Sequence, residues 1–189
     1  MSVFQKSLNH HLSTFEQVKK LETQVETVAK IMIQSLERGG KILWCGNGGS
    51  AADSQHLAAE LIGRFTRERR ALPAIALTTD SSILTAVAND YQYERIFSRQ
   101  VEGLCTKLDV LVGISTSGQS PNVIEAIRSA KNIGAQTIAF TGRDGGLAAQ
   151  IADFSLNVAE KDTARIQEAH IFLGHVLCDL IEAHFAAHD

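Results

Sequence analysis

Residues 109–127 read DVLVGISTSGQSPNVIEAI and place a strand, a polar loop and a helix in direct succession. After Asp109, residues 110–114 are apolar and rich in β-branched side chains, so a short strand buried on both faces is predicted over 109–114. Pro121 stands at a favoured first position of a helix, which we expect to run to Gly134. A strand that leads into a helix in this way is the repeating unit of an α/β fold.

The same alternation recurs along the chain. We predict strands over 41–45, 74–77, 109–114, 137–140 and 154–158, and helices over 50–65, 81–87, 94–104, 121–134 and 163–184. Apolar residues at helical spacing from Phe4 to Leu36 predict one or two further helices, which stop at Gly39-Gly40. The predicted fold is a three-layer α-β-α sandwich with a central parallel sheet, preceded by N-terminal helices. We expect one domain over 1–189, with a helical segment at 1–38 and an α/β core at 39–189.

Size and composition exclude several classes of protein. The chain has 189 residues, enough for one core, and a formal net charge of −3, which gives no general attraction to nucleic acid or anionic membranes. No apolar run approaches the ~20 residues of a membrane span, and residues 1–11 do not resemble a signal peptide. The three cysteines are widely spaced, which argues against a disulfide framework or a thiolate zinc site. We therefore expect a cytoplasmic protein with no nucleic-acid or membrane partner.

Two loops that follow predicted strands have the composition of anion-binding sites. The first, CGNGGSAAD at 45–53, has glycines that let backbone N–H groups approach a ligand, and Ser50 opens a helix. It matches neither the dinucleotide nor the Walker pattern, and its plain alternative is a tight turn with Ser50 and Asp53 as a capping box. The second, STSGQSP at 115–121, carries four hydroxyls, of which Ser120 alone is needed as a helix cap. The remaining hydroxyls favour phosphate binding over a solvated turn.

Two pairs of side chains are candidate metal ligands. His56 and Glu60 lie four residues apart on the helix after the first loop, so they share a face at a spacing compatible with zinc. A hydrogen-bonded surface pair is the alternative for them. Gln167 and His175 lie on the C-terminal helix, about 12 Å apart along its axis. They either reach one ion with extended side chains or belong to sites formed by different subunits. Gly174 would allow another segment to approach closely.

The segments GNGGSAADSQHLAAEL, AND at 88–90, GISTSGQSPNVIEAI, TGRDGG and TARIQEAHIFLGH resemble the sugar isomerase (SIS) superfamily and, within it, the phosphoheptose isomerases. The resemblance covers essentially the whole chain. It implies a homotetramer with active sites between subunits and one zinc per subunit. The implied metal ligands are His56, Glu60, Gln167 and His175, and the implied acid–base pair is Glu60 and His175. The implied substrate contacts are Asn47, Gly48, Gly49, Ser50, Glu60, Asn89, Asp90, Ser115, Thr116, Ser117, Ser120 and Gln167. Gln119 departs from the family, which usually has Asn there.

The implied reaction interconverts sedoheptulose 7-phosphate and D-glycero-D-manno-heptose 7-phosphate through an enediolate, the first step of ADP-heptose and lipopolysaccharide core biosynthesis. Three alternatives remain at this stage. One is a non-catalytic SIS-domain protein that binds the replication initiator DnaA, which has no need of the complete set of four ligands. Another is a sugar-phosphate-sensing regulatory domain, for which this length leaves no room for a DNA-binding module. The last is an isomerase for a hexulose or pentose phosphate, which sequence alone does not separate from a heptose enzyme.

Overall fold

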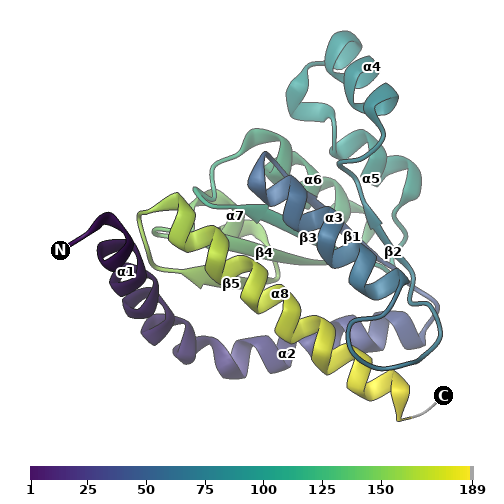
Figure 1. Ribbon diagram of the computed structural model, residues 1–189. Helices are drawn as coiled ribbons and strands as arrows, with labels where there is room; N and C mark the ends of the chain where they lie inside the picture. Colours follow the sequence, from purple (N-terminus) through teal and green to yellow (C-terminus); the bar gives the residue numbers. More distant parts are fainter. Residues whose placement is uncertain (188–189) are drawn as a thin grey trace.

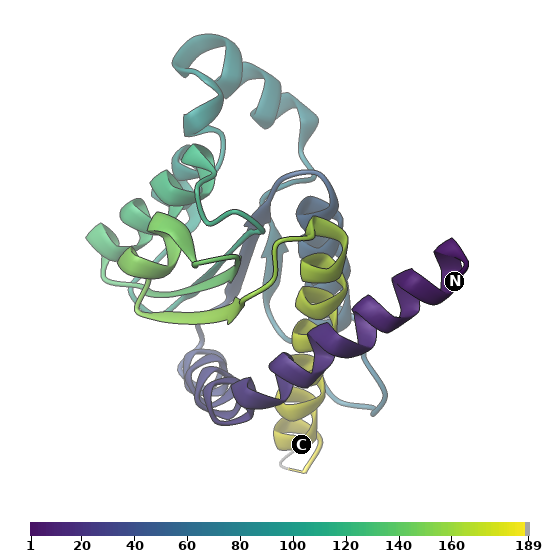
Figure 2. The same ribbon diagram turned by 90° about the vertical axis from the view of Figure 1, so that its left-hand side faces the viewer.

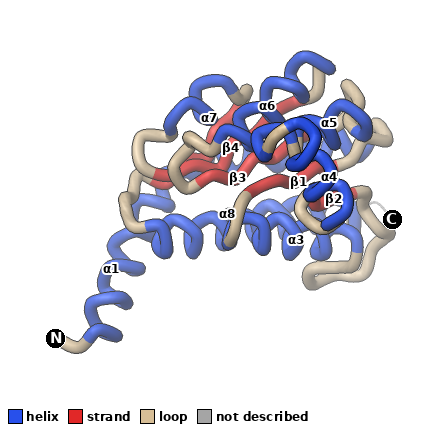
Figure 3. Tube along the Cα trace, turned by 90° about the horizontal axis from the view of Figure 1, so that it is seen from above, coloured by secondary structure: helices blue, strands red, loops and turns tan. Residues whose placement is uncertain are grey.

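The computed structural model describes residues 1–187 and contains a five-stranded parallel sheet with the order β2-β1-β3-β4-β5. The strands are β1 (Ile42–Gly46), β2 (Ala74–Ala76), β3 (Val110–Ser115), β4 (Gln136–Gly142) and β5 (Phe154–Val158). The helices are α1 (Val3–Val18), α2 (Glu22–Glu37), α3 (Gly49–Ile62), α4 (Ser81–Tyr91), α5 (Ser98–Leu104), α6 (Pro121–Ile133), α7 (Gly146–Ile151) and α8 (Thr163–Ala186). Short 3-10 turns occur at Lys19–Leu21 and Tyr93–Arg95. The predicted parallel sheet and its helical layers are confirmed (Figures 1 and 3).

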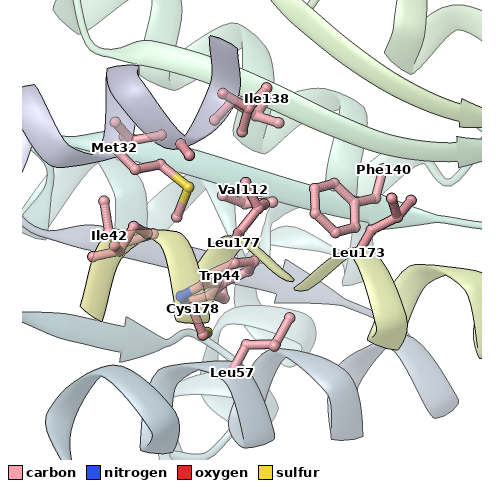
Figure 4. Packing of buried hydrophobic residues seen from close by; sticks show 14 of the residues in the cluster. Met32, Ile42, Trp44, Leu57, Val112, Ile138, Phe140, Leu173, Leu177 and Cys178 are labelled. Atoms are coloured by element: carbon pink, nitrogen blue, oxygen red, sulfur yellow. The ribbon is translucent and has the colours of Figure 1, made fainter. Parts of the chain in front are cut away.

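Each face of the sheet has its own apolar core. On one face, Trp44, Val112 and Phe140 pack against Leu173 and Leu177 of α8, as Figure 4 shows. The other face packs against α5, α6 and α7. Successive side chains along a strand point to opposite faces of the sheet, so neighbouring residues such as Leu43 and Trp44 pack into different cores. Both faces of every central strand are therefore buried, which explains the continuous apolar runs in the sequence.

Some helices differ from the sequence-based prediction, and the one or two helices expected at the N-terminus prove to be two. The helix expected over 50–65 ends at Ile62, because the chain turns away at Gly63. The loop then returns to the end of this helix, where the Leu72 N–H donates to the Leu61 carbonyl. The short helix α7 was not predicted, since TGRDGG indicates only a turn. The N-terminal segment forms two helices, and Figure 2 shows α1 crossing α8 and extending beyond the sheet. Within residues 1–187, no helix has the length and apolarity that a membrane crossing requires.

Candidate active site

The two loops expected to hold an anion lie side by side. Gly46 at the end of β1 pairs in register with Ile114 of β3, so both loops leave the same edge of the sheet. A reciprocal pair of amide hydrogen bonds joins them: Asn47 Nδ2 donates to Asn122 Oδ1 at 2.9 Å, and Asn122 Nδ2 donates to Asn47 Oδ1 at 2.8 Å. Asn122 is buried, and sequence analysis did not single it out. Its side chain fixes the position of one loop relative to the other.

Hydroxyl groups gather in the second loop. Ser115 Oγ lies 2.9 Å from Ser120 Oγ and 3.4 Å from Ser117 Oγ, and the Gln119 N–H donates to Ser117 Oγ at 3.1 Å. Ser120 stands at the N-cap of α6, but its side chain makes no capping hydrogen bond. Thr116 is half-buried in the same loop. The serine hydroxyls therefore remain clustered at a helix N-terminus, where the helix dipole favours an anion.

The first loop leads into α3 without the capping box that was its plain alternative. Gly48, with φ of 56°, is the N-cap, and no side chain caps the helix. A Cβ at Gly49 would lie 2.4 Å from Gln167 Nε2, so the amide of Gln167 covers this turn from α8. Ser50 is buried and donates its N–H to the Asn47 carbonyl. The structure thus brings Gln167 to the first loop.

A group of possible metal ligands lies farther along the same two helices. One ligand atom each from His56, Glu60 and His175 lies within 4.8 Å of the other two. His56 Nε2 is 2.9 Å from Glu60 Oε1 and 3.3 Å from His175 Nε2. Burial, together with repulsion from His56, lowers the pKa of His175 despite the attraction of Glu60. Two imidazoles and a carboxylate form a donor set suited to a divalent metal.

A close crossing of α3 and α8 creates this group. A Cβ at Gly174 would lie 2.5 Å from Leu57 Cδ1, so only a glycine lets the helices approach this far. His56 directly precedes Leu57 in the chain, and His175 directly follows Gly174, so the same contact brings the two histidines together. The close approach anticipated at Gly174 is confirmed, and its partner is α3.

Two further side chains lie near this site: the sequence did not point to Phe65, and it suggested only a helix-capping role for Asp53. The Phe65 ring stacks on His175, with centroids 5.3 Å apart and planes at 26°. Asp53 lies one turn before His56 on α3, and burial raises its pKa to about 6, although nearby His56 opposes the rise. The stacking of Phe65 on His175 belongs to no local pattern, because it depends on packing between distant segments.

Gln167 lies at the first loop and not in the metal group, whereas Asn89 and Asp90 join neither. Gln167 lies beside Gly49, about 12 Å along α8 from His175. Asn89 and Asp90 are exposed at the end of α4, where the Asn89 amide donates to the Asp90 carboxylate at 2.8 Å. No residue of α4 is buried, and Figure 1 shows this helix standing away from the sheet. Within one subunit, Asn89 and Asp90 are therefore presented on a protruding helix.

Comparisons with known proteins identify the family. The SIS domain family model matches residues 4–142. A phosphoheptose isomerase from Aquifex aeolicus is 61% identical over 159 residues, which are 84% of this chain and 83% of that protein. This chain belongs to the phosphoheptose isomerase family. Another family member, from a Nitratiruptor species, is 53% identical over 182 residues, covering 96% of this chain and 97% of the relative.

A solved structure of the same family agrees with these relatives. The phosphoheptose isomerase GmhA from Neisseria gonorrhoeae superposes with a TM-score of 0.90 at 46% identity, over 96% of this chain and 100% of that chain. The agreement extends from the N-terminal helices to α8. The alternative of a DnaA-binding protein receives no support from these phosphoheptose isomerases.

Proposed function

We propose that this protein interconverts sedoheptulose 7-phosphate and D-glycero-D-manno-heptose 7-phosphate. The observation that carries the proposal is the meeting of His56, Glu60 and His175 within 4.8 Å, on the two helices that also reach the first, glycine-rich loop. Relatives that are 61% and 53% identical carry the name phosphoheptose isomerase, which supports the same activity here. The reaction is the proposed first step of ADP-heptose synthesis for lipopolysaccharide, in the cytoplasm.

The phosphate of the substrate is assigned to the loop at 115–120. The proposed substrate contacts in the two loops are Asn47, Gly48, Gly49, Ser50, Ser115, Thr116, Ser117 and Ser120, together with Gln167 of α8. Hydroxyl groups at the N-terminus of α6 can share the charge of a phosphate dianion. Binding energy from this remote group would position the sugar carbons for reaction. Gln119 is exposed, so its difference from the usual Asn leaves the serine cluster intact.

Glu60 and His175 are the proposed acid–base pair. Aldose–ketose isomerisation moves one proton between C1 and C2 and another between the two oxygens, through an enediolate. Glu60 would take the carbon-bound proton and return it to the neighbouring carbon. The lowered pKa of His175 keeps its imidazole neutral near pH 7, so it can accept the hydroxyl proton and donate it back.

Zinc is the proposed metal, one ion per subunit, with His56, Glu60, Gln167 and His175 as its ligands. The 3.3 Å between the two imidazole Nε2 atoms fits this proposal, because nitrogens about 2.0–2.1 Å from a tetrahedral zinc stand about that far apart. Bound zinc would polarise the sugar carbonyl and offset the negative charge that develops on its oxygen. Because Gln167 lies near Gly49, it would have to extend toward the ion or bind in a neighbouring subunit's site.

We propose a homotetramer with active sites at subunit interfaces. An apolar groove of about 490 Å³ runs between α8 and the N-terminal helices, and Phe172 and Leu180 of α8 line it while remaining 43% and 37% exposed. The unburied helix α4 would gain contacts in such an assembly and carry Asn89 and Asp90 to the substrate. Residues 1–189 would act as one domain within each subunit.

The decisive experiment incubates the protein with sedoheptulose 7-phosphate, with and without a chelator, and measures the heptose product. We expect metal-dependent conversion. Glu60→Gln and His175→Gln should each lose most of the turnover and keep the fold. Glu125→Gln is the matched control, because Glu125 pairs with Arg128 on α6, across the sheet from α3. Near-full turnover in either site variant would reject the role assigned to that residue, and no conversion by the unmodified protein would reject the function.

A further inference from the structure

A buried carboxylate on α8 anchors the loop that follows α3. The Glu182 side chain has no exposed surface. Its oxygens accept hydrogen bonds from the backbone N–H groups of Phe65, Thr66 and Arg67 at 2.8, 2.6 and 2.8 Å, and from the Thr66 hydroxyl at 3.2 Å. Figure 1 shows this loop, between α3 and β2, curving round the C-terminal part of α8.

The partner of Glu182 is a guanidinium that holds the end of α3. The Arg69 side chain is also fully buried, and its Nη2 lies 3.5 Å from Glu182 Oε1. The same nitrogen donates to the Glu60 carbonyl at 2.7 Å, and Nη1 donates to the Gly63 carbonyl at 2.8 Å. The last carbonyls of a helix lack partners within the helix, so Arg69 acts as its C-terminal cap. One Glu–Arg pair thus ties together the helix end, the loop and α8.

A contribution to stability alone does not account for this arrangement. Removing two charges from water carries a large desolvation penalty, and apolar replacements of such pairs are often equally stable. Burial raises the pKa of Glu182, but the backbone donors of Thr66, Arg67 and Phe65 outweigh it, so the net shift is downward and the group stays ionised. An ionised pair fixes the geometry of the loop instead, because several hydrogen-bond donors must converge on the two carboxylate oxygens.

The groups fixed by this pair belong to the candidate active site. Phe65 donates its N–H to Glu182 and stacks its ring on His175. Arg69 holds the carbonyl of Glu60, whose side chain faces His56. Both members of the proposed acid–base pair are therefore in contact with the segment that the Glu182–Arg69 pair holds in place.

We propose that Glu182 and Arg69 are positioning residues for the isomerase site. Glu182 orients the ring of His175 through its hydrogen bond to Phe65, and Arg69 fixes the end of α3 through its hydrogen bond to the Glu60 carbonyl. Together they hold His175 and Glu60 in the arrangement needed for metal binding and proton transfer. Neither residue touches the substrate. The inference rests on the proposed function for its catalytic part, whereas its effect on metal binding is measured without substrate.

The test compares Glu182→Gln with a matched control, Asp109→Asn. Asp109 is likewise buried and accepts hydrogen bonds from the Lys41 and Thr106 backbone N–H groups and from Lys41 Nζ, but these partners lie outside α3, α8 and the loop between α3 and β2. For each variant we would measure the thermal midpoint, kcat and KM, and zinc affinity by competition with a chromophoric chelator. Gln keeps one acceptor oxygen and places an amide NH2 against a backbone donor, so the loop loses an anchor.

We expect both variants to lose thermal stability. Only Glu182→Gln should lower kcat and zinc affinity, each by about tenfold or more, with KM within about twofold of the unmodified protein. If Glu182→Gln retains kcat and zinc affinity, or if Asp109→Asn loses them equally, the positioning role is wrong. Should Glu182→Gln not fold, Phe65→Leu removes the stacked ring and leaves the anchor, and full zinc affinity and kcat in that variant would also overturn the proposal. Failure of the proposed function is distinguishable, because the unmodified protein would then bind zinc and convert no substrate.

Discussion

Replacing Gly174 by Ala tests whether the close crossing of α3 and α8 forms the candidate site. The new Cβ would lie 2.5 Å from Leu57 Cδ1 and 2.6 Å from Leu57 Cδ2. Non-bonded carbons pack at about 3.5–4.0 Å, so roughly 1 Å of space is missing. Leu57 has no exposed surface and cannot turn into solvent. The helices must therefore separate, or Leu57 must adopt a strained rotamer.

Two opposing effects determine the size of the change in stability. Alanine is favoured over glycine in a helix interior by about 1 kcal/mol. Overpacking a filled core costs about 1–3 kcal/mol. We expect Gly174→Ala to be destabilised by about 1 kcal/mol on balance, which lowers the melting temperature by about 2–4 °C in a protein of this size. Separation of the helices also widens the 3.3 Å gap between His56 and His175, so we expect a loss of kcat of roughly 10- to 100-fold.

Gly103→Ala is the matched control for helix propensity. Gly103 lies in α5, and a Cβ there would meet nothing within 4 Å, so this variant should gain about 0.5–1 kcal/mol and keep full activity. In a double-mutant cycle, Leu57→Ala should relieve the clash, giving a favourable coupling of about 1–3 kcal/mol with Gly174→Ala. Calorimetry and steady-state kinetics provide the measurements. A Gly174→Ala protein that melts higher than the unmodified one and turns over normally would refute the reasoning.

Three further changes address other parts of the molecule. Asn122→Leu removes both amide hydrogen bonds to Asn47, so we expect KM to rise about tenfold in steady-state assays while kcat changes less than about threefold. The Asp162 backbone N–H is the main cause that lowers the pKa of Glu160 from 4.5 to about 2. This carboxylate therefore stabilises the fold above pH 4.5, and its contribution is lost as the pH falls toward 2. Glu160→Gln should melt about 2–4 °C lower at pH 7 and lose less stability than the unmodified protein between pH 4.5 and 2. An unchanged dependence of stability on acid would contradict this. Phe172→Asp puts a charge on the proposed interface and should shift the proposed tetramer toward smaller species in light scattering; an unchanged mass would argue against that interface.

The sheet was predictable because each of its strands is encoded locally. A strand buried on both faces needs a continuous apolar run, which residues 110–114 provide, and the strand predicted over 109–114 differs from β3 by a single residue at each end. The six-residue helix α7 is too short to show helical periodicity, and its glycines indicate only a turn. The end of α3 depends on Glu182, more than a hundred residues away in the chain, so no local pattern reveals it.

The candidate site was predictable only within single elements. His56 and Glu60 could be paired from their spacing, because residues four apart on a helix share a face. The eight residues between Gln167 and His175 left two arrangements open. The structure places His175 with His56 in one subunit, because Gly174 and Leu57 fix the approach of the two helices. Phe65 and Asn122 enter the site through tertiary contacts, which a single sequence does not display.

The spacing along α3 and α8 has a consequence for the proposed substrate. Ser50 and His56 lie about 9 Å apart along α3, and Gln167 and His175 lie about 12 Å apart along α8. Both helices thus separate the anion-binding loops from the metal group by a similar length. A phosphate held at one end leaves room for a long carbon chain before the carbonyl reaches Glu60 and His175. A three-carbon sugar phosphate held in the same loops would be too short to reach that pair, so helix geometry favours long sugar phosphates.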